Sequence, residues 1–188
     1  MARHMRTSDA DILIIPGWSG SGPEHWQTRW EGKLSTARRV EQADWHKPHR
    51  DEWAANIVTA VKACTRPVVL VAHSAGVSSV AHAAGELADL KVAGAFLVAP
   101  ASERALHAIP GMPADFAKHA RHKLPFRAVL AASNNDPYCT VDEAQELAGA
   151  WGAEFSDAGD AGHINAASGH GPWPEGLMRF AGFLRSLG

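Results

Sequence analysis

Short apolar runs alternate along the chain with longer stretches of mixed polarity. The clearest runs show no regular alternation with polar residues, and the one at 67–73 is almost entirely Val, Leu and Ala. Runs of this kind are typical of strands buried on both faces, as in a parallel sheet covered by helices. They lie at 12–15, 67–73, 92–100 and 126–133, with shorter candidates at 37–42 and 153–156.

The stretches between these runs have the spacing of amphipathic helices. In 52–64, for example, Trp53, Ile57 and Val61 recur on one helical face. Further helices are expected at 24–34, 75–87, 141–151 and 175–187. Strands that alternate with helices imply right-handed βαβ units. The predicted fold class is therefore α/β, a three-layer α/β/α sandwich around a parallel sheet of about six strands.

One stretch, from 101 to 125, has no clean period. It carries Ile109, Pro110, Gly111 and Phe116. It could form a small cap over a pocket or a crossover helix with irregular flanks. We favour the crossover helix, because connections of this length are normal between parallel strands.

Chain length and the polar start suggest the domain organisation. The 188 residues fit one domain of ordinary size. We expect a disordered segment over 1–10 and a single domain over 11–188. The first apolar run, 12–15, is too short for a signal peptide or a membrane span. This favours a cytoplasmic protein that does not enter a membrane.

Charge and cysteine content exclude several classes of function. The net charge of -2 comes without any basic stripe, so nucleic acid is not an expected partner. Cys64 and Cys139 are far apart and lie in no CxxC or Cys/His ligand pattern. We therefore expect no disulfide framework, no metal site and no cofactor.

A serine stands between a predicted strand and a predicted helix. The sequence Ala72-His73-Ser74-Ala75-Gly76 matches the pattern Gly-x-Ser-x-Gly, with Ala72 in place of the first glycine. This pattern makes a sharp strand-to-helix turn that exposes the serine hydroxyl as a nucleophile. The alternative is that Ser74 only caps the helix. Neighbouring side chains at a strand end point to opposite sides, so His73 is expected to pack within the fold.

The loop after the first strand, Pro16-Gly17-Trp18, is expected to lie beside this serine. In a doubly wound sheet the first and third strands commonly pair, and ligands bind where their loops diverge. The backbone N–H groups of Trp18 and Ala75 would then form an oxyanion hole. Phosphate binding is disfavoured, because GWSGSG is not GxGxxG and lacks the P-loop lysine.

Five residues around these loops are candidates for the substrate pocket. For two of them, His25 and Trp26, an equal alternative is that the side chain only holds the loop in place. The candidates are Gly17, His25, Trp26, Tyr138 and Ile164.

An aspartate and a histidine follow later strands in the required order. When a serine in such an elbow is the nucleophile, the chain order is Ser, then Asp or Glu, then His. Asp136 follows the strand at 126–133, and Pro137 stiffens its turn. His163 follows the short strand at 153–156, where Gly162 gives the loop room. We expect Asp136 to orient His163, and His163 to act as the base.

Other titratable residues compete for these two roles. His170 lies further from the strand end than His163 and is ranked below it. Asp157 and Asp160 leave the strand that precedes the histidine, so we interpret them as solvated loop charges. The joint occurrence of all three residue types at strand ends favours a Ser-His-Asp triad.

The chain resembles the small α/β hydrolases typified by retinoblastoma-binding protein nine and by bacterial YdeN-like proteins. The likeness runs from about Ile12 to Leu184, and its carriers are the PGW loop with EHW, VLVAHSAG, SNNDPYCTVDEA and GHINAASGHGPWPEG. It implies a trimmed α/β-hydrolase fold with Ser74, Asp136 and His163 as the triad. The protein partner that the family name suggests is not carried over, because the pattern LxCxE is absent.

The predicted activity is acyl transfer to water. An activated serine, an oxyanion hole and no large lid favour small carboxyl esters, or amides, cleaved through an acyl-enzyme. The alternative is a binding module that kept the hydrolase scaffold with little turnover. Reactivity of Ser74 would separate these two hypotheses. Neither the natural substrate nor a protein partner can be read from the residues.

Overall fold

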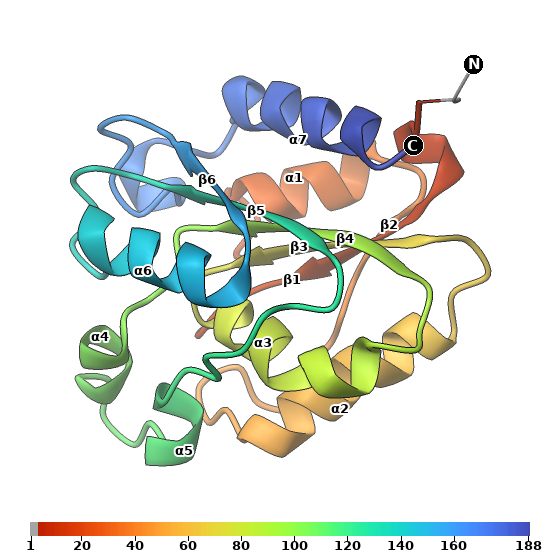
Figure 1. Cartoon of the computed structure of the whole chain (residues 1–188). Helices are drawn as coiled ribbons and strands as arrows, with labels where there is room; N and C mark the ends of the chain where they lie inside the picture. Colours follow the sequence, from red (N-terminus) through yellow and green to blue (C-terminus); the bar gives the residue numbers. More distant parts are fainter. Residues whose placement is uncertain (1–3) are drawn as a thin grey trace.

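The computed structural model describes residues 4–188. Within them the chain forms a six-stranded, all-parallel sheet in the order β2-β1-β3-β4-β5-β6 (Figure 1). The strands are β1 (Asp11–Ile15), β2 (Ala37–Arg39), β3 (Val68–His73), β4 (Val92–Val98), β5 (Arg127–Ala132) and β6 (Glu154–Asp157). As expected, the first strand pairs with the third, and the strand order reverses between them.

Helices cover both faces of this sheet. The helices α1 (Trp26–Lys33) and α7 (Pro174–Ser186) lie on one face. The opposite face carries α2 (Arg50–Lys62), α3 (Ala75–Leu87) and α6 (Val141–Trp151) (Figure 1). The predicted three-layer α/β fold is therefore confirmed. No helix between residues 4 and 188 is long and apolar enough to cross a membrane.

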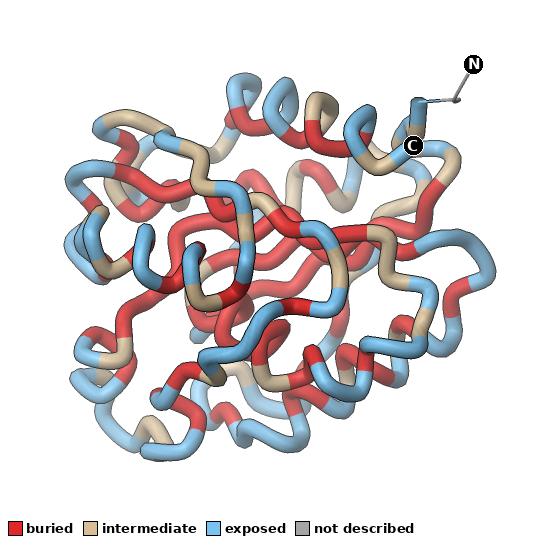
Figure 2. The backbone as a smooth tube through the Cα atoms, viewed as in Figure 1, coloured by how far each residue is buried: buried red, intermediate tan, exposed pale blue. Residues whose placement is uncertain are grey.

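Each central strand contributes to two hydrophobic cores. In β1, Leu13 and Ile15 pack toward α2 and α3, whereas Ile12 and Ile14 pack toward α1 and α7. Side chains alternate across a strand, so a strand covered on both faces must be apolar at every position. This explains the unbroken apolar runs in the sequence, and Figure 2 shows the central strands as buried.

Some predicted boundaries differ from the structure. The strand predicted over 92–100 ends at Val98, because Ala99 adopts a positive φ of 46° and turns the chain out of the sheet. The strand predicted over 37–42 covers only 37–39. The disorder expected for 1–10 is wrong from residue 4, since Thr7–Asp9 form a 3-10 turn and Met5 packs on the core. Residues 1–3 lie outside the described residues.

The crossover helix expected between 101 and 125 is not present. Two short helices, α4 (Glu103–His107) and α5 (Ala114–Ala117), stand there instead. Pro110, Gly111 with its φ of +78°, and Pro113 separate them and prevent a continuous helix. Leu106 and Phe116 from this segment pack with Trp53 in a third apolar cluster. The segment thus builds a small cap beside the sheet, the interpretation that the sequence left as second choice.

The start of α3 presses closely against the end of β1. A Cβ atom added to Gly76 would lie 2.4 Å from the carbonyl oxygen of Ile15 and 2.6 Å from that of Pro16. Both contacts are with backbone, which cannot swing away as a long side chain could. The glycine of the serine motif is therefore required by packing between β1 and α3.

Replacing Gly76 by alanine is expected to lower the free energy of unfolding by about 2–3 kcal/mol, through overpacking against backbone. Gly85→Ala on the same helix is the matched control. A Cβ atom there meets nothing within 4 Å, so helix propensity should raise stability by up to about 1 kcal/mol. Urea unfolding measures both variants, and equal effects would contradict the close-approach argument.

A buried histidine ties the cap to the rest of the fold. The Nε2–H of His119 donates to the carbonyl of Ala101 at 3.0 Å, and Ser78 Oγ donates to Nδ1 at 3.3 Å. Burial lowers the pKa of His119 to about 4. The folded protein therefore keeps this ring neutral over a pH range in which the unfolded chain protonates it.

Stability should consequently fall as the pH drops below the unfolded-state pKa of about 6.5, and the loss should level off near pH 4. Between pH 7 and pH 5, His119 alone should account for about 2 kcal/mol of this loss. His119→Gln removes the titration, and the two proteins should differ by that amount in their pH dependence. Urea unfolding at both pH values measures it, and identical pH dependence would contradict the assignment.

Candidate active site

Ser74 occupies the turn between β3 and α3 in a strained conformation. Its backbone has φ 55° and ψ −125°, outside the regions that non-glycine residues normally adopt. Such strain costs about 1–3 kcal/mol and persists only where the surroundings enforce it. Here Gly76 lets the helix approach β1, and the Ser74 N–H donates to the carbonyl of Val98 at 3.1 Å. The turn has the backbone geometry expected of the nucleophile elbow that the sequence predicts.

Ser74, His163 and Asp136 form one hydrogen-bonded line. The distance from Ser74 Oγ to His163 Nε2 is 2.9 Å. On the other side of the ring, His163 Nδ1 lies 2.9 and 3.0 Å from the two carboxylate oxygens of Asp136. The N–H of Tyr138 donates to Asp136 Oδ1 at 2.9 Å and fixes the carboxylate. The structure thus brings together the three residues proposed from chain order.

The loop that carries His163 is held to the loop after β5 by polar side chains. Asn135 Oδ1 accepts the N–H of Gly162 at 2.7 Å, and Ser133 Oγ accepts the N–H of Ala161 at 2.9 Å. Sequence reasoning gave neither residue a role. Their position just before Asp136 was the available signal, because neighbours of a site residue on the same loop share its surroundings.

Two buried rings also hold the loop of His163, through hydrogen bonds to its backbone carbonyls. His73 Nε2–H donates to the carbonyl of His163 at 2.8 Å, and Trp26 Nε1–H donates to the carbonyl of Ile164 at 2.9 Å. His73 packs within the fold, as expected. Trp26 and Ile164 were predicted to line the pocket, but both are fully buried and lie outside its lining. That prediction is corrected, and Trp26 takes the alternative role of holding a loop.

The competing residues lie elsewhere. His170 hydrogen-bonds Ser168 Oγ at 3.1 Å and packs against Trp173. Asp157 and Asp160 are exposed, and Asp157 accepts hydrogen bonds from Gly159 and Asn134 in its own neighbourhood. None of the three lines the pocket around Ser74.

Two backbone N–H groups are free beside the serine hydroxyl. In residues 4–188, neither the N–H of Trp18 nor that of Ala75 has a hydrogen-bond acceptor. Gly17 brings their loops together, since a Cβ atom on it would lie 3.0 Å from the nitrogen of Ala75. The Trp18 ring is anchored away from these groups, with its Nε1–H donating to the carbonyl of His46 at 3.2 Å. The two donors predicted for an oxyanion hole are therefore available.

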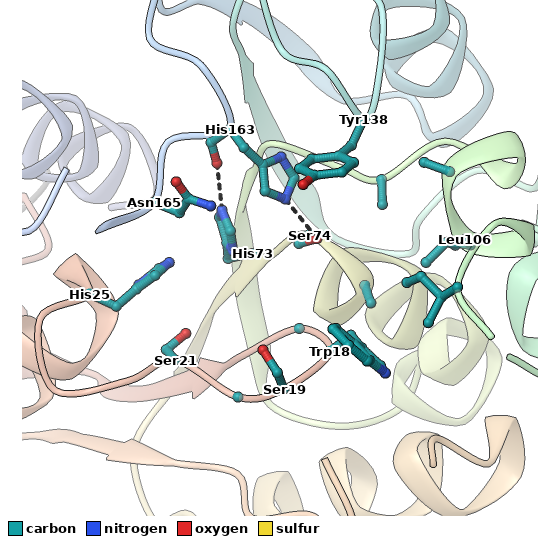
Figure 3. Close-up of a pocket in the computed structure, with 16 residues that line it drawn as sticks. Trp18, Ser19, Ser21, His25, His73, Ser74, Leu106, Tyr138, His163 and Asn165 are labelled. Atoms are coloured by element: carbon teal, nitrogen blue, oxygen red, sulfur yellow. Dashed lines mark hydrogen bonds between the residues drawn. The ribbon is translucent and has the colours of Figure 1, made fainter. Parts of the chain in front are cut away.

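The pocket over Ser74 has a cavity volume of about 350 Å³ and two unlike sides. Figure 3 shows Ser21, His25 and Asn165 on one side of the serine, with Leu106 on the other. The apolar side also receives Ala101, Ala105 and Ile109 from the cap segment, which sequence reasoning missed because the segment has no period. Of the predicted pocket residues, Gly17, His25 and Tyr138 do line the cavity.

The histidines behind the serine are neutral at pH 7. Burial, reinforced by the neighbouring His163, lowers the pKa of His25 to about 4 and that of His73 well below its usual range. Neither ring can therefore act as a charged partner for a substrate near neutral pH. Between residues 4 and 188, no group of three or more His, Cys, Asp or Glu side chains could hold a metal ion.

Comparison with known proteins agrees with this geometry. The family model described as "Serine hydrolase" matches residues 12–182. A protein named as a YdeN-like hydrolase from Pectobacterium atrosepticum is 34% identical, with 96% of this chain and 94% of that chain covered and a TM-score of 0.84. No match was found among curated proteins.

Two more distant structures share the fold. The ydeN gene product of B. subtilis is 18% identical, with 92% of this chain and 98% of that chain covered and a TM-score of 0.72. The esterase domain of a Rhodothermus marinus protein is 15% identical, with 95% of this chain and 88% of that chain covered and a TM-score of 0.69. The likeness to retinoblastoma-binding protein nine stays a prediction. From the matched family model and the YdeN-like relative, the chain belongs to the serine hydrolase family and is a hydrolase with the α/β-hydrolase fold.

Proposed function

We propose that the protein hydrolyses small carboxyl esters through a Ser74-His163-Asp136 triad and an acyl-enzyme intermediate. The observation that carries the proposal is the 2.9 Å contact between Ser74 Oγ and His163 Nε2, in line with Asp136. A serine hydroxyl is a weak nucleophile unless a base removes its proton, and the base in turn needs an orienting group. Both requirements are met at one pocket.

The proposed reaction follows from the position of each group. His163 takes the proton of Ser74 as Oγ attacks the ester carbonyl, and Asp136 stabilises the charged imidazole. The N–H groups of Trp18 and Ala75 donate to the oxyanion that forms. His163 then protonates the leaving alcohol, and water, activated in the same way, releases the acid and restores the serine. An amide could be attacked by the same groups.

The size of the pocket supports a small substrate. A cavity of about 350 Å³ is at the lower end of the range typical for small-molecule sites. One side of it is walled by α4 and the residues that flank this short helix. The partner that fits is a small-molecule ester. The sequence left open a second function, a binding module with little turnover, and no feature of the pocket favours that reading.

Ser74 should react with a fluorophosphonate probe, which labels only activated serines. We expect one adduct on the folded protein, located at Ser74 by mass spectrometry. Ser74→Ala should abolish the labelling, and His163→Ala should slow it strongly, because the base is lost. Folded protein that stays unlabelled would contradict the triad and favour the binding module.

Asp136→Asn should lower kcat for a p-nitrophenyl ester by about 10³–10⁴-fold, because an amide in that place no longer holds the imidazole in the required tautomer. Asp157→Asn is the matched control, since Asp157 is an exposed carboxylate at the end of β6 and its replacement should leave kcat unchanged. A loss below tenfold for Asp136→Asn would show that another group orients the histidine.

A further inference from the structure

We propose that the side of the pocket formed by Ser21, His25 and Asn165 is a subsite for an uncharged hydrogen-bond acceptor of the substrate, such as an ether or hydroxyl oxygen, with His25 as its donor. The inference rests on the proposed esterase function and names the substrate class more closely. In the substrate so described, either the acyl half or the alcohol half of the ester carries an uncharged oxygen, and the other half is apolar.

The first observation is a histidine donor without an acceptor. His25 caps α1: its Nδ1 accepts the N–H of Gln27 at 3.1 Å. The proton of the neutral ring must therefore be on Nε2. This atom is buried and has no hydrogen-bond partner in the part of the chain that the structure describes. A buried donor is normally satisfied, so this exception beside the pocket is a position where an acceptor atom of a substrate would bind.

The second observation is that hydrogen bonds hold the polar groups of this wall in place. Ser21 Oγ donates to Gln27 Oε1 at 2.6 Å, and the amide of Gln27 donates to the carbonyls of Ile15 and Val71. The carbonyl of Ser21 accepts from Thr28 and Arg39. This network fixes the wall of the pocket beside His25.

The third observation is the direction of the ring. Figure 3 shows His25 extending from its loop toward His73 and Asn165, on the side of Ser74 that faces away from Leu106. His25 is also part of the lining of the cavity. A substrate bound at Ser74 therefore places one of its two halves toward His25 and the other toward the apolar cap.

The charge of the lining decides which acceptor fits. No Lys, Arg, Asp or Glu belongs to the lining of this cavity. The nearby Arg39 is held by Glu31 and Thr28 and is not part of that lining. A carboxylate or phosphate would lose its hydration without gaining a counter-charge, so an uncharged oxygen is the acceptor that the subsite suits.

The test compares isosteric esters that differ by one oxygen. The first pair, p-nitrophenyl 3-methoxypropanoate and p-nitrophenyl pentanoate, places the oxygen in the acyl half. The second pair, 2-methoxyethyl butanoate and butyl butanoate, places it in the alcohol half. Rates are divided by those of alkaline hydrolysis to remove intrinsic reactivity. In one of the pairs, kcat/KM should favour the ether by about tenfold, equivalent to about 1.4 kcal/mol.

Two variants then test His25 itself. His25→Asn keeps an oxygen that can cap α1 but removes the Nε2 donor, and His25→Phe keeps the ring volume without any donor. Both should bring the ratio close to one, and because the readout is a ratio, a general loss of activity cancels. His82→Asn is the matched control: His82 also has a buried nitrogen without a partner, but it lies on α3 outside the pocket, so the ratio should stay near tenfold.

The outcomes separate the two proposals. If the unmodified protein hydrolyses none of the four esters, the proposed function itself is contradicted. If it hydrolyses them with ratios near one in both pairs, the subsite is wrong and the esterase function stands. If the preference survives in both His25 variants, the acceptor is bound by another donor and the assignment to His25 is overturned.

Discussion

The close approach between the end of β1 and the start of α3 is the constraint on which the site depends. Because β1 pairs with β3, the loop that leaves β1 must pass directly over the turn at Ser74. Glycines stand on both sides of this contact: a Cβ atom on Gly76 would meet backbone at 2.4 Å, which leaves no room for it, and one on Gly17 would make a tight contact at 3.0 Å. The same close approach accompanies the strained turn at Ser74 and brings the loop of Trp18 next to Ala75, and in residues 4–188 the N–H groups of both residues lack an acceptor.

The loop of His163 depends on a different device. The loop lies outside the sheet, and several of its backbone groups are satisfied by side chains from distant parts of the chain, as buried polar groups must be. Asn135 receives the N–H of Gly162, while His73 and Trp26 donate to the carbonyls of residues 163 and 164. A histidine that must align with both Ser74 and Asp136 is thereby placed by hydrogen bonds made on both sides of the loop.

A feature of the fold or the site could be predicted from the sequence where residues close together in the chain determine it. Buried strands have an unbroken apolar pattern, and parallel strands end at one edge of the sheet. Chain order together with strand ends therefore located Ser74, Asp136 and His163 as a group. The cap at 101–125 was only the second choice, since its short helices have too few turns to show a period. Trp26 was misplaced because its partner, Ile164, is 138 positions away.

The three histidines near Ser74 illustrate how burial assigns roles to identical side chains. The ring centre of His73 lies 4.7 Å from that of His25 and 4.9 Å from that of His163. Three charged rings at these distances would repel one another strongly. Burial lowers the pKa values of His25 and His73, and each ring then uses one nitrogen to hold backbone. Only His163 of the three contacts a carboxylate. The fold thus keeps the two histidines beside His163 as neutral hydrogen-bonding groups near pH 7.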